Sequence, residues 1–305
     1  MKNIIIGIIL VIIIGLGLYF LIPNSSNDSE GTEYKNTSIN TKQNNQQAEE
    51  IATTTPKTIS EFEIGKSVEE KNIMAYQYGE GDTEILFIGG IHGGYGWNTS
   101  LLAYEAVDYF KANPDKIPNN LKITIIPVLN PDGLNKTVGS SERFEISAVP
   151  DSQTELIAGR FNANQVDLNR NFDCDWQATS KWQNKTVSGG TEIFSEPESQ
   201  AIKNYIETQK PQAVIVWYSA AGGVYSSSCH NGISKETKNL TKTYATASGY
   251  KSYEEFDSYD ITGDMVNWLA KKNIPAISVL LTNHTETEWN KNKSGIEAIL
   301  NQYSL

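Results

Sequence analysis

Four short apolar runs rich in β-branched residues constrain the fold of this chain most strongly. They cover residues 85–91, 122–129, 213–218 and 276–282, and each is bounded by Pro, Gly or Asn. Apolar runs of this length are typical of strands that are buried on both faces. Patterns with helical periodicity separate and follow them, at residues 98–112, 196–208, 236–248, 263–272 and 286–302. This alternation predicts an α/β domain with helices on both faces of a central sheet.

The N-terminal part of the chain differs in composition from the rest. Residues 4–22 form an uncharged run rich in Ile, Leu and Gly, and Lys2 is the one charged side chain before it. Such a run is long enough to cross a hydrocarbon core of ~30 Å, so we predict a membrane anchor at residues 1–23. The positive-inside rule then places the rest of the chain on the extracytoplasmic side. A cleaved signal peptide is the alternative interpretation of this run.

A polar segment follows the apolar run. Residues 24–58 are rich in Ser, Asn, Thr and Gln and hold few large apolar side chains, which predicts a disordered linker. Residues 59–305 are then one domain, which we expect to be monomeric. The formal net charge of −11 argues against a nucleic-acid-binding surface.

His92 stands out because it lies on a glycine-rich loop between a predicted strand and a predicted helix. The sequence around it is "GGIHGGYGWNT", in which Gly93, Gly94 and Gly96 leave His92 with few neighbouring side chains. In open α/β sheets, ligands bind outside the carboxyl ends of the strands. The strand ends near Tyr218 and Leu280 should therefore lie close to His92, which predicts a site there.

Six segments carry a resemblance to a known family. They are "GGIHGGYGWNT" (89–99), "VLNPDGLN" (128–135), "GRFNANQVDLNRNFDCDW" (159–176), "WYSAAGGVYSSSC" (217–229), "YDITGDMVNWLA" (259–270) and "IPAISVLLTNH" (274–284). In order and approximate spacing they resemble the zinc carboxypeptidases of the carboxypeptidase A type, in particular bacterial extracytoplasmic members. The resemblance implies a mixed, twisted sheet of roughly eight strands. It also implies a catalytic zinc held by two histidines and a glutamate, with a separate carboxylate as general base.

The same resemblance locates the catalytic positions, and most of them hold unsuitable side chains. The first zinc ligand corresponds to His92. The glutamate ligand falls at Tyr95 in the spacing of the broad family and at Gly96 in that of its nearest members. Tyr218 stands where the second histidine is expected, and Leu280 where the general base is expected. Zinc sites in proteins have three or four protein ligands, so we predict that zinc is absent or weakly bound and that His92 is vestigial.

The substrate-holding positions, by contrast, match the family. The resemblance gives Asn169 and Arg170 the role of gripping a C-terminal carboxylate, which suits the planar guanidinium. Arg160 corresponds to the arginine that polarises the scissile carbonyl, and Tyr259 to a tyrosine that closes over the substrate. The alternatives are a buried salt bridge for Arg170, a solvated Arg160 and a surface aromatic at Tyr259. The specificity position falls near Val266, which predicts apolar C-terminal side chains.

The remaining cysteines and histidines have less direct interpretations. The resemblance implies a disulfide between Cys174 and Cys229, which would join two loops at the rim of the site. His230 is interpreted as a loop residue. His284 lies near the site mouth and is a weak candidate for a replacement zinc ligand.

Three functions follow from these residues. The favoured hypothesis is a membrane-anchored carboxypeptidase homologue with impaired catalysis that keeps a pocket for peptide or protein C-termini. An active metallocarboxypeptidase with unfamiliar ligands is the first alternative. The second is a non-catalytic surface protein in which the pocket has no ligand.

Overall fold

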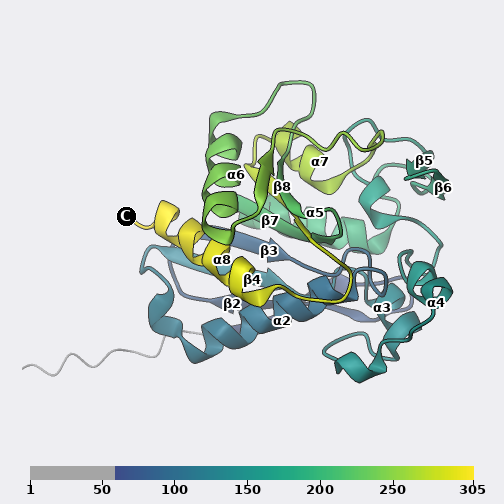
Figure 1. The fold of residues 1–305 in the computed structure, drawn as a ribbon, viewed down its shortest axis with the longest axis horizontal. Helices are drawn as coiled ribbons and strands as arrows, with labels where there is room; N and C mark the ends of the chain where they lie inside the picture. The colour runs from purple at the N-terminus through teal and green to yellow at the C-terminus, as the bar shows by residue number, and fades with distance from the viewer. Residues whose placement is uncertain (1–58) are drawn as a thin grey trace, which may run out of the picture. The chain divides into compact units, whose positions relative to one another are not determined.

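The computed structural model describes residues 59–305 (Figure 1). The predicted anchor at 1–23 and the predicted linker at 24–58 lie outside the described residues. Within residues 59–305, no helix combines the length and the apolar character that crossing a membrane requires.

The core of the domain is a mixed eight-stranded sheet with the strand order β1-β2-β4-β3-β7-β10-β8-β9. The strands are β1 (Ile59–Lys66), β2 (Asn72–Tyr78), β3 (Thr83–Ile88), β4 (Leu121–Ile126), β7 (Ala213–Ser219), β8 (Gly223–Ser226), β9 (Lys251–Tyr253) and β10 (Ala276–Leu281). The central strands β4, β3, β7 and β10 are parallel, and they are the four apolar runs that the sequence predicted. Strands β2 and β8 pair antiparallel with their central neighbours, so the sheet is mixed, as the resemblance implied.

Helices cover the two faces of the sheet in separate layers. Along β7, Ile215 and Trp217 point into one apolar core, and Val214 and Val216 point into the other. The first core is closed by α2 (Trp97–Ala112), α6 (Lys235–Ser248) and α8 (Trp289–Tyr303), which lie in front of the sheet in Figure 1. The second is closed by α5 (Pro197–Gln209) and α7 (Met265–Lys271). Two-sided burial explains why the central strands lack polar alternation.

Most of the remaining elements lie at the edge where the central strands end. They are α3 (Pro131–Val138), α4 (Gln153–Ala158), the 3₁₀ turns Ile146–Ala148 and Leu168–Arg170, and a hairpin of β5 (Thr179–Trp182) and β6 (Lys185–Ser188). A further 3₁₀ turn, Pro114–Lys116, connects α2 to the start of β4 at the opposite edge. The hairpin is a separate two-stranded sheet. The sequence patterns did not predict it.

A buried cluster of carboxylates fixes the loop at residues 162–171. Asn162 Nδ2 donates to Glu196 Oε2 at 2.7 Å and to Glu198 Oε2 at 3.1 Å. At the other end of the loop, Asn171 Oδ1 accepts from the backbone N–H of Glu196 at 3.2 Å. Glu198 is completely buried, and this burial raises the pKa of its carboxyl to about 7. The loop that carries Asn169 and Arg170 is thus held at both ends by the start of α5.

We predict that Glu198 makes the stability of the domain depend on pH. In the unfolded chain the pKa of Glu198 is ~4.3, and in the folded domain it is about 7. Between these two pH values the folded state therefore binds one more proton than the unfolded state. The stability that this proton provides is fully present below the unfolded pKa and is lost as the pH rises through 7. Glu198→Gln stays neutral, so it should reduce the loss of unfolding free energy between pH 5 and pH 8 by up to about 3 kcal/mol. Its amide oxygen can accept from only one of the two donors, Asn162 Nδ2 and the backbone N–H of Val68, so the comparison is made between the two pH values and not at one of them. Urea unfolding at pH 5 and pH 8 measures this.

The exposed Glu192 provides the control. Glu192→Gln should leave the pH dependence unchanged. If wild type, Glu198→Gln and Glu192→Gln lose equal stability between pH 5 and pH 8, Glu198 is not the responsible group.

Candidate functional site

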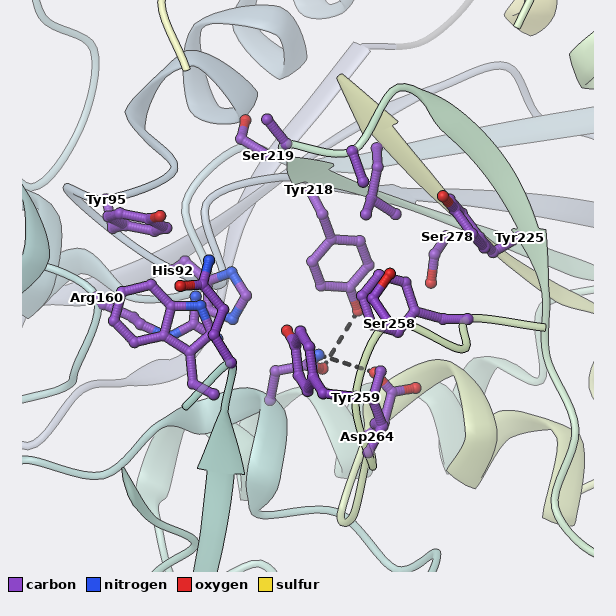
Figure 2. Close-up of a pocket in the computed structure, with 18 of the residues that line it drawn as sticks. His92, Tyr95, Arg160, Tyr218, Ser219, Tyr225, Ser258, Tyr259, Asp264 and Ser278 are labelled. Atoms are coloured by element: carbon purple, nitrogen blue, oxygen red, sulfur yellow. Dashed lines mark hydrogen bonds between the residues drawn. The ribbon is translucent and has the colours of Figure 1, made fainter. Parts of the chain in front are cut away.

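A cavity of about 600 Å³ lies where three central strands end (Figure 2). His92 follows β3, Tyr218 is near the end of β7, and Leu280 is near the end of β10; all three line the cavity. Tyr218 and Leu280 are paired neighbours in the parallel ladder of β7 and β10. The predicted convergence of these strand ends is confirmed.

The glycines beside His92 differ in whether the backbone around them requires glycine. Gly93 has a φ of +39°, and a Cβ at this position would lie 2.6 Å from the carbonyl oxygen of Gly159. A Cβ on Gly96 would instead have ordinary contacts, the nearest at 3.5 Å to His92 Cβ. Gly96 is therefore a position where a side chain fits, whereas Gly93 is not.

His92 is buried and neutral. Its side chain lies in the wall of the cavity with only 6% of the residue exposed. Its Nε2 is 3.5 Å from Asp167 Oδ1, too far for a good hydrogen bond. Burial, aided by the charge of Arg160, lowers the pKa of His92 to about 4. At neutral pH, His92 therefore adds no positive charge to the cavity.

Asp167 pairs with Arg160 beneath the cavity. Arg160 Nε donates to Asp167 Oδ2 at 2.9 Å, and the backbone N–H of Asn169 donates to Oδ1 at 3.2 Å. The Arg160 guanidinium also lies 4.3 Å from the ring centre of Trp182. Burial opposes ionisation of Asp167, but Arg160 and the other neighbouring donors outweigh it and hold the pKa of this carboxyl well below its usual range. Arg160 is 2% exposed, so the alternative of a solvated Arg160 is wrong.

Arg170 is a buried cation without a carboxylate partner among residues 59–305. The residue is 1% exposed and lines the cavity. Its Nε donates to the carbonyl oxygen of Lys181 at 2.9 Å, and its Nη1 donates to that of Asn169 at 2.6 Å. Over residues 59–305 it forms no ion pair, so the alternative of a buried salt bridge is wrong for this part of the chain. Its remaining N–H groups are available to a ligand.

Asn169, Tyr218 and Asp264 form a hydrogen-bonded chain beside Arg170 (dashed lines in Figure 2). The Tyr218 hydroxyl donates to Asn169 Oδ1 at 3.2 Å, and Asn169 Nδ2 donates to Asp264 Oδ2 at 2.8 Å. Asp264 Oδ1 accepts from the backbone N–H of Asn267 at 3.0 Å and so caps α7. Burial raises the pKa of Tyr218 well above 10, so its phenol stays protonated.

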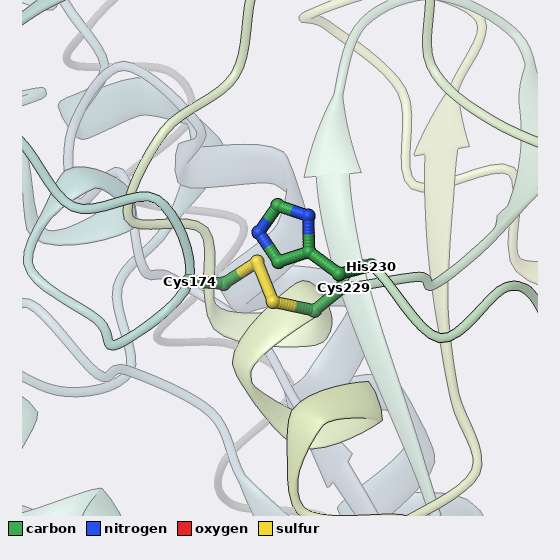
Figure 3. Close-up of side chains that lie close together, drawn as sticks. All are labelled: Cys174, Cys229 and His230. Carbon is green, nitrogen blue, oxygen red and sulfur yellow. A yellow bond between two sulfur atoms is a disulfide. The ribbon is translucent and has the colours of Figure 1, made fainter.

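The donors around His92 do not fit a zinc ion held by two histidines and a carboxylate. Tyr218 is a protonated phenol, Leu280 has no donor atom, and both oxygens of Asp167 are already engaged. Within the described part of the chain, one His/Cys/Asp/Glu triplet is compact enough to share a metal: Cys174, Cys229 and His230. Its two sulfur atoms are bonded to each other, so they are not free ligands (Figure 3).

The disulfide between Cys174 and Cys229 confirms the predicted pairing. It links the segment after the Arg170 loop to the segment after β8 (Figure 3). The neighbouring His230 is exposed, and its Nε2 lies 2.8 Å from Asp175 Oδ1. His230 is thus a loop residue at the disulfide.

The structure also locates Tyr259 and His284, the two other ring side chains that the sequence analysis named. Tyr259 lines the cavity, and the guanidinium carbon of Arg170 lies 6.0 Å from its ring centre. His284 is half-buried at the mouth, with its ring centre 4.6 Å from that of Tyr95, and is not in the cavity wall.

Comparison with known proteins identifies the family. A profile of the zinc carboxypeptidase family matches residues 45–302 of the chain. The chain belongs to the zinc carboxypeptidase family. Among curated family relatives, the uncharacterized protein YqgT of Bacillus subtilis (strain 168) is 26% identical over 164 residues, which cover 50% of this chain and 43% of YqgT. Carboxypeptidase Z of Rattus norvegicus is 26% identical over 185 residues, which cover 56% of this chain and 26% of that protein. The matched region thus spans less than half of either relative.

Solved structures of the family share the fold. Murein-tripeptide amidase MpaA from Escherichia coli O157 superposes with a TM-score of 0.56 at 17% identity, covering 80% of this chain and 92% of MpaA. Bovine thrombin-activatable fibrinolysis inhibitor gives a TM-score of 0.62 at 17% identity, covering 80% of this chain and 90% of the inhibitor. These similarities establish the family fold.

Three residues of the site were not singled out from the sequence. Asp167 and Asp264 lie in the quoted family segments, but nothing in those segments indicates that they contact Arg160 and Asn169. Trp182 lies in the hairpin that the patterns missed, and its contact with Arg160 is purely tertiary. Only the folded structure reveals these partners.

We predict that the carboxylate of Asp167 is essential for stability. Asp167→Asn removes the charge that compensates buried Arg160, and breaking a buried ion pair typically costs about 3–5 kcal/mol. The exposed Asp175 offers a matched control, because Asp175→Asn should change the free energy of unfolding by less than about 1 kcal/mol. Urea unfolding measures both variants. Equal, small losses in the two variants would show that the buried pair contributes little.

Proposed function

We propose that this domain binds the C-termini of peptides or proteins and lacks the zinc-dependent hydrolysis of its family. The buried Arg170, which lines the cavity and has no carboxylate partner in the described part of the chain, is the observation that carries the proposal. An unpaired buried guanidinium is costly, and an incoming carboxylate compensates it. A peptide C-terminus supplies such a group.

The neighbouring side chains suit the rest of a peptide end. Asn169 is held in place by Tyr218 and Asp264, so its amide is oriented before a ligand arrives. Arg160 uses Nε for Asp167, which leaves its other N–H groups for a peptide carbonyl oxygen. Tyr259, on the loop before α7, lines the cavity with its ring centre 6.0 Å from the guanidinium carbon of Arg170. Binding to such prearranged donors loses little conformational entropy.

Impaired hydrolysis rests on the residues at three catalytic positions. If the family assignment of Gly96, Tyr218 and Leu280 holds, the site lacks two zinc ligands and the general base. When zinc is held by three protein ligands, it activates a water molecule for attack on the peptide bond. His92 alone offers one ligand, and general-base catalysis typically contributes about 10²–10⁴-fold.

An active peptidase is the second candidate, and family membership favours it. The structure named murein-tripeptide amidase shares the fold, and the family profile is that of zinc carboxypeptidases. This candidate requires metal ligands that the family does not use, or ligands from outside residues 59–305. Metal analysis separates it from the main proposal.

We also propose that the domain acts outside the cytoplasm, anchored by residues 1–23 as a monomer. The Cys174–Cys229 disulfide supports this location, because disulfides persist in oxidising compartments.

We predict that binding requires a free C-terminal carboxylate and Arg170. A fluorescent peptide with a free C-terminus should bind at least about 30-fold more tightly than the same peptide with a C-terminal amide. Arg170→Ala should remove this difference, whereas Arg143→Ala, which removes an exposed arginine paired with Asp108, should keep it. Fluorescence anisotropy measures the dissociation constants. Equal affinities of wild type for acid and amide would contradict the proposal, whatever the stability of the variants.

We further predict that wild type purifies without a stoichiometric zinc ion and that three substitutions create a zinc site. In Gly96→Glu/Tyr218→His/Leu280→Glu, the Cβ of the new glutamate at 96 has only ordinary contacts, and His92 becomes one of three ligands. The triple variant should bind one zinc per chain in metal analysis. Adding His92→Ala to it should remove that zinc. Stoichiometric zinc in wild type together with release of C-terminal residues from peptides would overturn the pseudoenzyme proposal.

A further inference from the structure

His92 is a buried side chain whose ring nitrogens have no good hydrogen-bonding partner among residues 59–305. Its Nε2 is completely buried and unpartnered, with Asp167 Oδ1 3.5 Å away. The other nitrogen, Nδ1, forms no hydrogen bond within these residues either, but it is not completely buried. Because His92 lines the cavity, Nδ1 opens into it. Buried polar groups in native proteins are nearly always hydrogen-bonded, so an unpartnered ring nitrogen in a cavity wall calls for a ligand atom.

The position of Asp167 determines which ring nitrogen carries the proton. Asp167 is the anion of the ion pair with Arg160, and its Oδ1 lies on the Nε2 side of His92. A proton on Nε2 points toward this negative charge, whereas a lone pair there would be repelled by it. In a neutral imidazole one nitrogen donates and the other accepts. Neutral His92 therefore presents the lone pair of Nδ1, a hydrogen-bond acceptor, to the cavity.

Arg160 is the donor that accompanies this acceptor. Its Nε binds Asp167 Oδ2 at 2.9 Å, while His92 lies next to Oδ1 of the same carboxylate. The two side chains are therefore neighbours in one wall of the cavity (Figure 2). Tyr218, with its ring centre 5.7 Å from that of His92, directs its hydroxyl hydrogen to Asn169 and so does not satisfy Nδ1. This wall thus offers a ligand one acceptor and one donor side by side.

The backbone of an extended peptide has the matching pair of groups. In an extended chain, the N–H and the C=O of one residue point to the same side, as they do in an antiparallel hydrogen-bonded pair. The carbonyl assigned to Arg160 is the scissile one, which belongs to the penultimate residue of the peptide. The N–H of that residue then points toward the same wall, where His92 Nδ1 is the neighbouring acceptor.

We propose that His92 Nδ1 accepts a hydrogen bond from the backbone N–H of the penultimate residue of the bound peptide. This inference rests on the proposed binding of C-termini at Arg170. It gives His92 a role in binding that needs no metal, in place of the expectation that His92 is only vestigial. It also defines the ligand more narrowly, as a peptide whose penultimate residue is linked through an N–H.

The test compares three peptides with the same side chains and a free C-terminus. In the first ester analogue, oxygen replaces the N–H of the penultimate residue; in the second, it replaces the N–H of the residue before that. Wild type should bind the parent peptide about tenfold more tightly than the first ester, because an ester oxygen cannot donate to Nδ1. The second ester lacks an N–H that points away from this wall, so it should bind within about threefold of the parent. Fluorescence anisotropy measures the dissociation constants, with a chelator present so that no metal competes for His92.

Two variants assign the effect to His92. His92→Phe keeps a ring but has no acceptor, so it should bind the parent peptide and the first ester equally. His230→Phe changes an exposed histidine outside the cavity and should keep the tenfold difference. Equal binding of the parent and the first ester by wild type overturns the inference without any variant, and so does a difference that survives in His92→Phe. If the parent peptide still binds in an Arg170-dependent manner, the proposed function stands; if none of the peptides binds to wild type, both fail.

Discussion

The buried ion pair between Arg160 and Asp167 determines the electrostatics of the whole site. One carboxylate faces three groups that can carry positive charge: Arg160, His92 and, further away, Arg170. Asp167 accepts hydrogen bonds from the Arg160 guanidinium and from the backbone N–H of Asn169, so its charge neutralises that of Arg160. Burial keeps His92 neutral. The charge of Arg170 is then left for a ligand, and the same loop that holds Asp167 also positions Arg170.

The central part of the fold could be predicted from the sequence because burial on both faces leaves a clear pattern. The parallel strands β4, β3, β7 and β10 are continuous apolar runs, and the helices that cover them have helical periodicity. The outer strands leave weaker patterns. Strand β1 is partly exposed along its length, and β9 consists of three exposed residues that are held by pairing with β8. Their strand conformation comes from the sheet next to them, and a local pattern cannot contain that information.

The residues of the site could be predicted where the chain segment that carries each residue identifies it without its tertiary contacts. The family segments led to His92, Arg170, Tyr218 and Tyr259, and the structure brings all four to one cavity. The lack of a carboxylate partner for Arg170 depends on segments distant in the sequence, and so does the acidic lining beside Val266. Counting residues from Tyr259 led to Val266, which lines a cavity of about 450 Å³ together with Glu255, Asp257 and Asp260.

Charge balance gives a physical reason why the two carboxylate positions of the family site would change together with the loss of the metal. In the family site, a zinc ion with two positive charges is offset by the glutamate ligand and by the glutamate base. If the metal were lost while either carboxylate stayed, an unpaired anion would remain in a cavity that must attract a carboxylate to Arg170. The residues Gly96, Tyr218 and Leu280 are all uncharged, since burial keeps the Tyr218 phenol protonated. On the proposed assignment, the metal-free site therefore keeps the net charge of the zinc-loaded one. On that proposal, the binding of a C-terminus depends on Arg170 and its neighbours alone, without a metal.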